Sequence, residues 1–240
     1  MRELIALSYS PWSEKARWAL DHHGIEYDEK QHLIMLGEPW LRIRARRLTG
    51  RVSVPLLVDG DRLYGDSFEI ARYAEWFGAG APLLDDMPAV ERWNATSERA
   101  LAAGRVIGTE RMADDTAAKR EQLPPFVPRA LRPALAPAAS LGIAFVRRKY
   151  AFDHVARAET HLEDALAQLR AALAGRDTLL DAFSYADIAM SAVLHFVSPV
   201  GDDHIRLGPA TRTCWTHPRL AADYADLVTW RDRLYATRRH

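Results

Sequence analysis

The sequence of 240 residues contains only one cysteine, Cys214. A single thiol excludes an intrachain disulfide, a cluster of thiolate metal ligands and a C-x-x-C redox pair. Its position in an expected late loop beside Trp215 predicts a partly buried apolar residue rather than a nucleophile. The nine histidines follow no spacing typical of metal ligands, so the sequence predicts a protein without a metal cofactor.

The chain also lacks an excess of charge of either sign, because 32 basic residues balance 32 acidic ones. No global field attracts a polyanion, so nucleic acid is not an expected partner. Long apolar runs are missing too: the first residues do not resemble a signal peptide, and the longest mostly apolar stretch, 134–146, is too short to span a bilayer. With 48% hydrophobic and 27% charged residues, the composition predicts a folded cytoplasmic protein that does not bind membranes.

The first third of the sequence alternates strand-like and helix-like patterns. Short apolar runs predict strands, and Asp59-Gly60-Asp61 predicts the turn of a hairpin between the last two of them. Apolar residues spaced three and four apart predict helices, the last of which is ended by Gly78 and Gly80. The predicted order is strand 4–9, helix 13–23, strand 27–32, helix 39–48, strands 54–58 and 62–64, and helix 67–77.

From about residue 88 onward, strand patterns are absent and the sequence predicts only helices. Apolar residues at spacings of three, four and seven predict a helix over 153–174. Ser184 and Asp187 have the form of a capping box, which predicts a helix start, and a last helix is predicted over 220–237. Five prolines between 114 and 140 favour a broken, irregular connection. We place the domain boundary at 79–88, with an α/β domain at 1–80 and an all-helical domain at 88–240.

Three motifs of the first domain carry residue types suited to binding an anion or a peptide. Ser10-Pro11-Trp12 lies where the first strand meets the first helix, whose N-terminal N–H groups stabilise negative charge. Val54-Pro55 precedes a strand, and proline is the only residue for which a cis peptide bond is cheap. Asp66-Ser67 begins a helix, where a carboxylate can pair with an ammonium group and N–H groups can bind a carboxylate.

At this spacing, on a βαβα unit followed by a hairpin and a helix, the motifs resemble those of the glutathione transferase superfamily, in its bacterial-like two-domain form with an active-site serine. The resemblance covers nearly the whole chain. It implies a thioredoxin-like domain of order βαβαββα, an all-helical domain and glutathione as co-substrate. It further implies that Ser10 activates the thiol, with Trp12 beside it among the glutathione-binding residues. Val54 before a cis Pro55 is implied to pair with the cysteinyl main chain, and Asp66 and Ser67 to hold the γ-glutamyl end. A homodimer is expected from the resemblance alone.

Several roles stay open at this stage. Ser13 and Tyr9 are rival catalytic hydroxyls. A basic side chain commonly meets the glycine carboxylate in this family, and we favour Arg51 among the five arginines before Val54, which are Arg42, Arg44, Arg46, Arg47 and Arg51. Taken alone, Val54-Pro55 is equally explained by a trans proline that begins an edge strand. Asp66-Ser67 alone is equally explained as a helix N-cap.

The second substrate is expected in a cleft between the domains. We expect Trp12 to wall the electrophile pocket, with Trp93 and Arg105 facing it from the first long helix, although a tryptophan at helical spacing is usually packed in a core. The leading hypothesis is a detoxifying glutathione transferase that attacks a small, hydrophobic electrophile. The alternatives are a glutathione-dependent isomerase or dehalogenase of the same fold, and a transferase-like protein that binds ligands without turnover.

Overall fold

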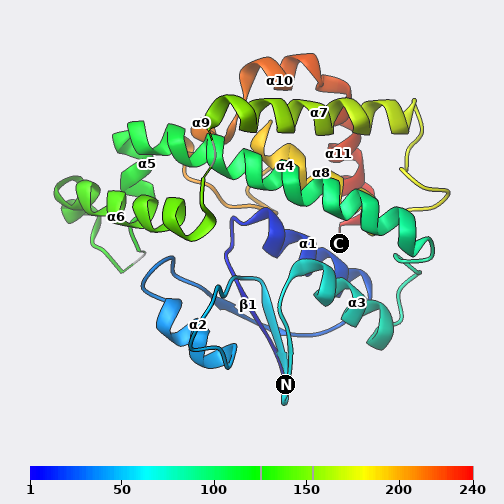
Figure 1. The fold of residues 1–240 in the computed structure, drawn as a ribbon, viewed down its shortest axis with the longest axis horizontal. Helices are drawn as coiled ribbons and strands as arrows, with labels where there is room; N and C mark the ends of the chain where they lie inside the picture. The colour runs from blue at the N-terminus through cyan, green and yellow to red at the C-terminus, as the bar shows by residue number, and fades with distance from the viewer. Residues whose placement is uncertain (125, 153, 240) are drawn as a thin grey trace.

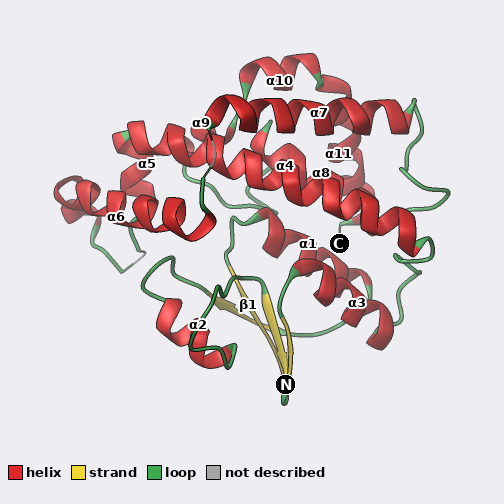
Figure 2. Ribbon diagram, viewed as in Figure 1, coloured by secondary structure: helices red, strands yellow, loops and turns green. Residues whose placement is uncertain are grey.

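The computed structural model describes residues 1–124, 126–152 and 154–239. Its first elements form a four-stranded sheet in the order β2-β1-β3-β4. Strand β1 (Arg2–Ala6) runs parallel to β2 (Asp28–Gln31) and antiparallel to β3 (Leu56–Asp59), which pairs antiparallel with β4 (Arg62–Tyr64). Three helices accompany the sheet: α1 (Pro11–His22), α2 (Glu38–Arg44) and α3 (Ser67–Phe77). Figure 2 shows these strands gathered at one end of the molecule.

The two faces of the sheet bury different residues, because side chains alternate along a strand. On β1, Leu4 and Ala6 join the main core with α1 and α3, whereas Ile5 belongs to a smaller core on the other face. There Ile5 packs with Leu56 of β3 and Leu41 of α2. Helices α1 and α3 therefore lie between the sheet and the helices of the second domain (Figure 1).

In the described part of the chain beyond α3, all regular elements are helical. The 28-residue helix α4 (Met87–Asp114) packs along α7 (Val155–Leu173) and α8 (Tyr185–Val193), and α8 also contacts α1. Buried residues of these helices continue the main core that begins in the sheet. The other elements are α5 (Thr116–Glu121), η1 (Arg129–Leu131), α6 (Arg132–Tyr150), η2 (Leu194–Phe196), α9 (Pro209–Trp215), α10 (Pro218–Asp223) and α11 (Ala225–Arg238).

The centre of α4 is positioned by a close approach at Gly104. A Cβ at this position would lie 2.3 Å from Cδ2 of Phe196, which is closer than carbon atoms can pack. Glycine therefore lets α4 approach η2 and the ring beneath it, and this contact sets the depth of the helix in the core. None of the described helices is both long and apolar enough to cross a membrane.

The predicted fold class is confirmed, because a small α/β domain of order βαβαββα is followed by helices. The helix predicted over 67–77 has the bounds of α3, and the capping box of Ser184 and Asp187 begins α8 with both reciprocal bonds. The helix predicted over 153–174 is α7, which begins at Val155. Its predicted first position, 153, lies outside the described residues.

Three predictions for the helical domain are wrong. The proline-rich stretch is not irregular throughout, because α5 occupies part of it and α6 begins at Arg132 and continues through Pro137. Pro133 fits the first turn of α6, where its missing N–H has no bond to lose, so only Pro137 removes an internal bond. Pro125 lies outside the described residues. The helix predicted over 220–237 is divided at Tyr224 into α10 and α11, and Cys214 lies buried in α9 rather than in a loop.

Candidate functional site

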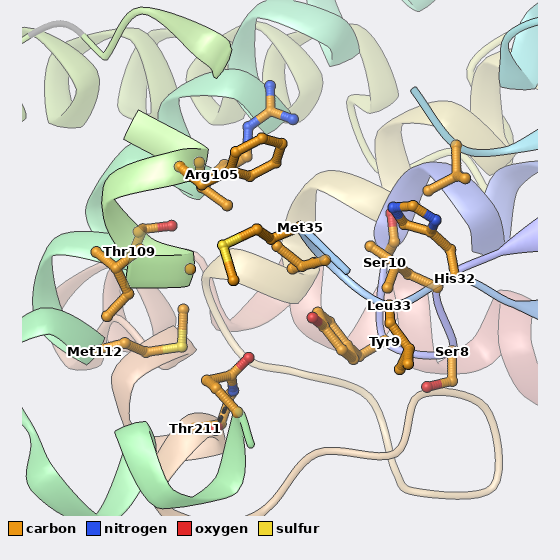
Figure 3. A pocket seen from close by; sticks show the side chains of 18 of the residues that line it. Ser8, Tyr9, Ser10, His32, Leu33, Met35, Arg105, Thr109, Met112 and Thr211 are labelled. Atoms are coloured by element: carbon orange, nitrogen blue, oxygen red, sulfur yellow. Dashed lines mark hydrogen bonds between the residues drawn. The ribbon is translucent and has the colours of Figure 1, made fainter. Parts of the chain in front are cut away.

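A cavity of about 1160 Å³ lies between the sheet domain and the helices. The sheet domain contributes the loops after β1 and β2, the segment before β3 and the start of α3. Residues of α4, α6 and α9 contribute the opposite wall. In Figure 3, Ser10 and His32 lie on one side, Arg105 and Thr109 of α4 lie on the other, and Met35 projects between them.

Ser10 lines this cavity as the N-cap of α1. Its extended backbone (φ −78°, ψ 125°) turns the chain into the helix, and its Oγ accepts a long bond of 3.5 Å from the N–H of Ser13. Within the described residues, neither the Ser10 hydroxyl proton nor the N–H of Trp12 has an acceptor. The start of α1 therefore offers two unused donors to an anionic sulfur, with the helix dipole behind them.

The two rival hydroxyls differ in their access to the cavity. Ser13 is fully buried outside the cavity lining, and its Oγ accepts a 3.1 Å bond from the N–H of Leu7. Tyr9 lines the cavity and packs edge-on against Trp215, and burial raises the pKa of its hydroxyl to about 12. Ser13 therefore stabilises the β1–α1 loop, whereas Tyr9 presents a neutral hydroxyl.

The peptide bond between Val54 and Pro55 is cis, as the resemblance implies. Both residues line the cavity immediately before β3. Across the described ranges, neither the N–H nor the C=O of Val54 has a backbone partner. An unpaired main-chain donor and acceptor beside a cavity can bind an extended peptide as an added strand binds to a sheet edge.

Asp66 and Ser67 line the cavity at the start of α3. Asp66 is the N-cap, and its Oδ1 accepts bonds of 2.8 and 2.9 Å from the N–H groups of Phe68 and Glu69. The other oxygen, Oδ2, accepts no bond from the residues that the structure describes, and the Asp66 side chain is exposed. Asp66 can therefore cap the helix with one oxygen and bind a ligand with the other.

Of the five arginines before Val54, only Arg51 lines this cavity. It has no carboxylate partner within the described chain, and its guanidinium carbon lies 5.7 Å from the centre of the Tyr150 ring. The other four arginines lie elsewhere: Arg42 donates to main-chain carbonyls, Arg44 to Glu3 and Arg46 to Asp61, and Arg47 is exposed.

Trp12 is held against the second domain by an ion pair whose lysine is fully buried and whose glutamate is partly exposed. Its indole Nε1 donates a 2.7 Å bond to Oε2 of Glu98 in α4, and Oε1 of Glu98 lies 2.6 Å from Nζ of the fully buried Lys15. Burial acts to raise the pKa of Glu98, but the charge of Lys15 and the hydrogen bonds from Lys15 and Trp12 lower it below its usual range. The carboxylate is therefore ionised and joins the start of α1 to α4.

Arg105 lies between two aromatic rings on the opposite wall. Its guanidinium carbon is 4.4 Å from the centre of the Trp12 ring and 3.6 Å from the centre of the Tyr150 ring at the end of α6. Trp93, which we expected beside it, lies outside the cavity lining and packs against the main core. Asn94, Glu98 and Arg105 share one face of α4, and Trp93 is turned from that face by one helical position.

Several residues of the site escaped the sequence prediction. His32 is 5% exposed and lines the cavity after β2. Its Nδ1 has no hydrogen-bond partner in the described chain, and burial together with the nearby Lys149 lowers its pKa. Neither His32 nor Tyr150 carries a sequence signal, and the burial of Lys15 within the first motif, which requires a partner for its ammonium group, is also visible only in the structure.

The described residues contain no group of three or more His, Cys, Asp or Glu side chains placed to hold a metal ion. Cys214 is buried in α9, and this burial raises the pKa of its thiol. The hydrogen-bond donors of the cavity lining that have no partner in the described chain are thus hydroxyl, main-chain and guanidinium groups. They suit an anionic, peptide-like ligand.

Two family models match the chain. The model described as glutathione S-transferase, N-terminal domain, matches residues 9–75, and the model described as glutathione S-transferase, C-terminal domain, matches residues 152–235. The first match includes Ser10 and both of the pairs Val54-Pro55 and Asp66-Ser67. No curated protein sequence matches the chain.

Solved structures of low sequence identity share the fold over nearly the whole chain. A glutathione S-transferase from Methylobacillus flagellatus KT with glutathione bound is 16% identical, with a TM-score of 0.63 and coverage of 98% of this chain and 95% of that one. The beta-etherase LigF from Sphingobium sp. strain SYK-6 is 17% identical, with a TM-score of 0.63 and the same coverage. A glutathione transferase family member from Pseudomonas fluorescens Pf-5, with bound S-(propanoic acid)-glutathione, is 16% identical, with a TM-score of 0.58 and coverage of 98% and 92%.

Proposed function

This chain belongs to the glutathione transferase superfamily, and from that premise we propose that it binds glutathione and uses Ser10 to activate the thiol for attack on a small, hydrophobic electrophile. The observation that carries the proposal is a single cavity that contains the Ser10 hydroxyl, the free main chain of Val54 and the Asp66-Ser67 helix start. A peptide thiol with one ammonium and two carboxylate groups matches this set of donors and acceptors.

Each part of glutathione has a counterpart in the proposal. The free oxygen of Asp66 pairs with the γ-glutamyl ammonium, and Ser67 at the start of α3 binds the α-carboxylate. The main chain of Val54 pairs with the cysteinyl residue, and Arg51 pairs with the glycine carboxylate. The two neighbours that were solved with glutathione or its S-propanoic acid derivative support binding of the same ligand here.

The chemical step needs a thiolate rather than a thiol. The Ser10 hydroxyl donates a hydrogen bond to the sulfur and favours loss of the thiol proton to water, and the partial charge of the α1 N-terminus adds to this effect. The thiolate forms a C–S bond with the electrophilic carbon, and a leaving group departs with the bonding electron pair or, in an addition, a proton from water completes the product. Holding both reactants in one cavity supplies most of the remaining advantage.

The first experiment is calorimetric titration of glutathione into the native chain, followed by rate measurements with an aryl halide, an enone, an alkyl halide and an aryl ether. We expect saturable binding and turnover of at least one electrophile. Ser10→Ala should retain glutathione binding, raise the pKa of the bound thiol in an ultraviolet thiolate titration, and lower kcat/KM by about 100-fold.

Product analysis distinguishes conjugation from isomerisation and dehalogenation, which start from the same thiolate. Absence of glutathione binding would overturn the proposal. Binding without turnover of any electrophile would favour a ligand-binding protein instead. Loss of activity in Ser13→Ala but not in Ser10→Ala would transfer the catalytic role to Ser13.

A further inference from the structure

Arg105 is an unpaired cation in the cavity wall, beside the same Tyr150 ring that Arg51 and Lys149 approach. In the described part of the chain it forms no ion pair and no hydrogen bond, and its Nε is fully buried without a partner. Its contacts are the rings of Trp12 and Tyr150, at 4.4 and 3.6 Å. Aromatic rings stabilise a cation but accept only weak hydrogen bonds, so the N–H groups of Arg105 are left for a ligand.

The other buried or half-buried charges of the cavity wall are already satisfied within the protein. Glu98 pairs with Lys15, and Lys149 lies 2.8 Å from Glu38 of α2. Glu121 accepts bonds from the N–H groups at the start of α9. Apart from Arg105, the charged side chains of the lining without such a partner are exposed: Arg51, Asp66 and Arg206.

Keeping a guanidinium unpaired in this position costs free energy, because burial disfavours the charged form. Burial accordingly lowers the pKa of Arg105. Tyr150 and Glu98 act to raise this pKa, and the nearby positive charge of Arg51 acts to lower it further. Arginine nevertheless stays charged at neutral pH. A cation that is held in place by two rings and lacks an internal acceptor is complementary to an anion that arrives from outside.

Arg105 borders the part of the cavity assigned to glutathione, because the Tyr150 ring that covers it also lies 5.7 Å from the guanidinium carbon of Arg51. It lies on α4 with Thr109 and Met112 one and two turns further along the same wall, across the cavity from Ser10 (Figure 3). Beyond these residues, the wall is built from apolar side chains such as Ile143, Phe196 and Trp215. A ligand that reaches Arg105 from this region therefore has an apolar body.

We infer that Arg105 binds a carboxylate carried by the electrophile, so that the second substrates are apolar, aromatic-sized carboxylic acids with a reactive carbon. The planar guanidinium presents paired N–H groups that match the two oxygens of a carboxylate. Trp12 and Tyr150 position the guanidinium, and the apolar wall takes the body of the acid. This inference rests on the proposed function, since it names the substrate class of the same site.

The test measures binding without turnover and without glutathione. Phenylbutyrate and its neutral amide, phenylbutyramide, differ in the charged group alone, and calorimetry or competition with a fluorescent ligand gives both affinities. We expect the native chain to prefer the acid by about tenfold, the size of a charge-assisted hydrogen bond. Arg105→Met should abolish this preference while retaining affinity for the amide.

Two further variants make the result specific. Arg99→Met changes an exposed arginine of the same helix that does not line the cavity, and it should keep the preference of the native chain. Arg105→Lys retains the charge without the paired N–H geometry, so it should keep part of the preference. Circular dichroism and glutathione titration on the same samples show whether each variant is folded.

Equal affinity of the native chain for acid and amide would overturn the inference, as would absence of binding of both probes. A preference that persists in Arg105→Met, or that is lost in Arg51→Met instead, would assign the carboxylate to another group. Failure of the proposed function has a different signature, because it appears as absence of glutathione binding whatever the outcome with phenylbutyrate.

Discussion

The two walls of the cavity are built by different means. On the sheet side, the groups that face the cavity are main-chain atoms, a helix N-cap and hydroxyls: Ser10 at α1, Val54 before β3, and Asp66 with Ser67 at α3. On the helical side, they are long side chains such as Arg105 of α4 and Tyr150 of α6, two residues that lie more than forty positions apart in the sequence. The first wall is specified by turns and caps, and the second by how helices pack.

This difference supports the proposed division of the two substrates between the walls. Main-chain groups at fixed turns bind the same peptide-like ligand whatever the neighbouring side chains are, since every peptide presents the same N–H and C=O pattern. Side chains on packed helices can be replaced without changing the fold. We therefore expect the sheet wall to select glutathione and the helical wall to select the electrophile, and four experiments test this division in order of decreasing expected effect.

The largest effect is expected where the two walls are joined, at the ion pair of Lys15 and Glu98. Glu98→Gln leaves the fully buried ammonium of Lys15 without a counter-charge. We expect the free energy of unfolding in urea to fall by about 3 kcal/mol, the low end for a broken buried pair because the Glu98 side chain is 42% exposed. Lys15→Met combined with Glu98→Gln should recover much of this loss. A double variant as unstable as Glu98→Gln would contradict the role of the pair.

The second effect concerns the packing of the helical wall. Gly104→Ala forces a methyl group against Phe196, and overpacking of this kind costs about 2 kcal/mol. Gly142→Ala is the matched control, since Gly142 lies within α6 and an added Cβ would meet no atom within 4 Å. Alanine should stabilise that helix by up to about 1 kcal/mol. Thermal and urea unfolding measure both changes, and a shift of the same sign in the two variants would refute the close approach of α4.

The third prediction separates the cap role of Asp66 from its proposed role in binding glutathione. Asp66→Asn keeps an Oδ1 acceptor for the N–H groups of Phe68 and Glu69, and asparagine caps helices as well as aspartate. Stability should therefore hold, while the glutathione dissociation constant rises by about tenfold, equivalent to about 1.4 kcal/mol. Asp66→Ala should lose both the binding and the cap. Unchanged affinity in Asp66→Asn would leave Asp66 with the cap role alone.

The smallest effect is a pH dependence from His32, which lines the sheet wall after β2. Burial and the charge of Lys149 lower the pKa of His32 in the folded protein, so the unfolded chain takes up the proton first as the pH falls. Its contribution to stability is present above the ordinary pKa and is lost as the pH falls toward the lowered one. Between about pH 7 and pH 5.5, the free energy of unfolding of the native chain should fall by up to about 1 kcal/mol more than that of His32→Gln, as measured by urea unfolding.

Removal of the nearby positive charge tests the cause of this shift. In Lys149→Met, the negative charge of Glu38 is no longer neutralised by the ion pair with Lys149. The pKa of His32 should therefore rise, and nuclear magnetic resonance titration of the imidazole ring measures the change directly. A titration midpoint that stays at its native value would show that burial alone sets it.

Much of the fold could be predicted from the sequence because its signals are local. The Asp-Gly turn, the Gly78 stop and the capping box of Ser184 with Asp187 each act within a few residues, and each marks an element boundary near its predicted place. The prediction of an irregular connection in the proline-rich stretch was wrong because it left out such local information. A proline count ignores position within the helix, and Pro133 in the first turn of α6 removes no hydrogen bond.

The candidate site divides in the same way. The sequence by itself determined the sheet wall, because Ser10, Val54-Pro55 and Asp66-Ser67 act through their own main chain and the adjoining helix starts. Only the tertiary structure decided the helical wall: that Asn94 and Glu98 face the cavity and Trp93 does not, that Glu98 meets Lys15, and that Tyr150 covers Arg105. The physical reason is that a cap or a turn is fixed by neighbours in sequence, whereas a contact between helices depends on the packing of the whole core.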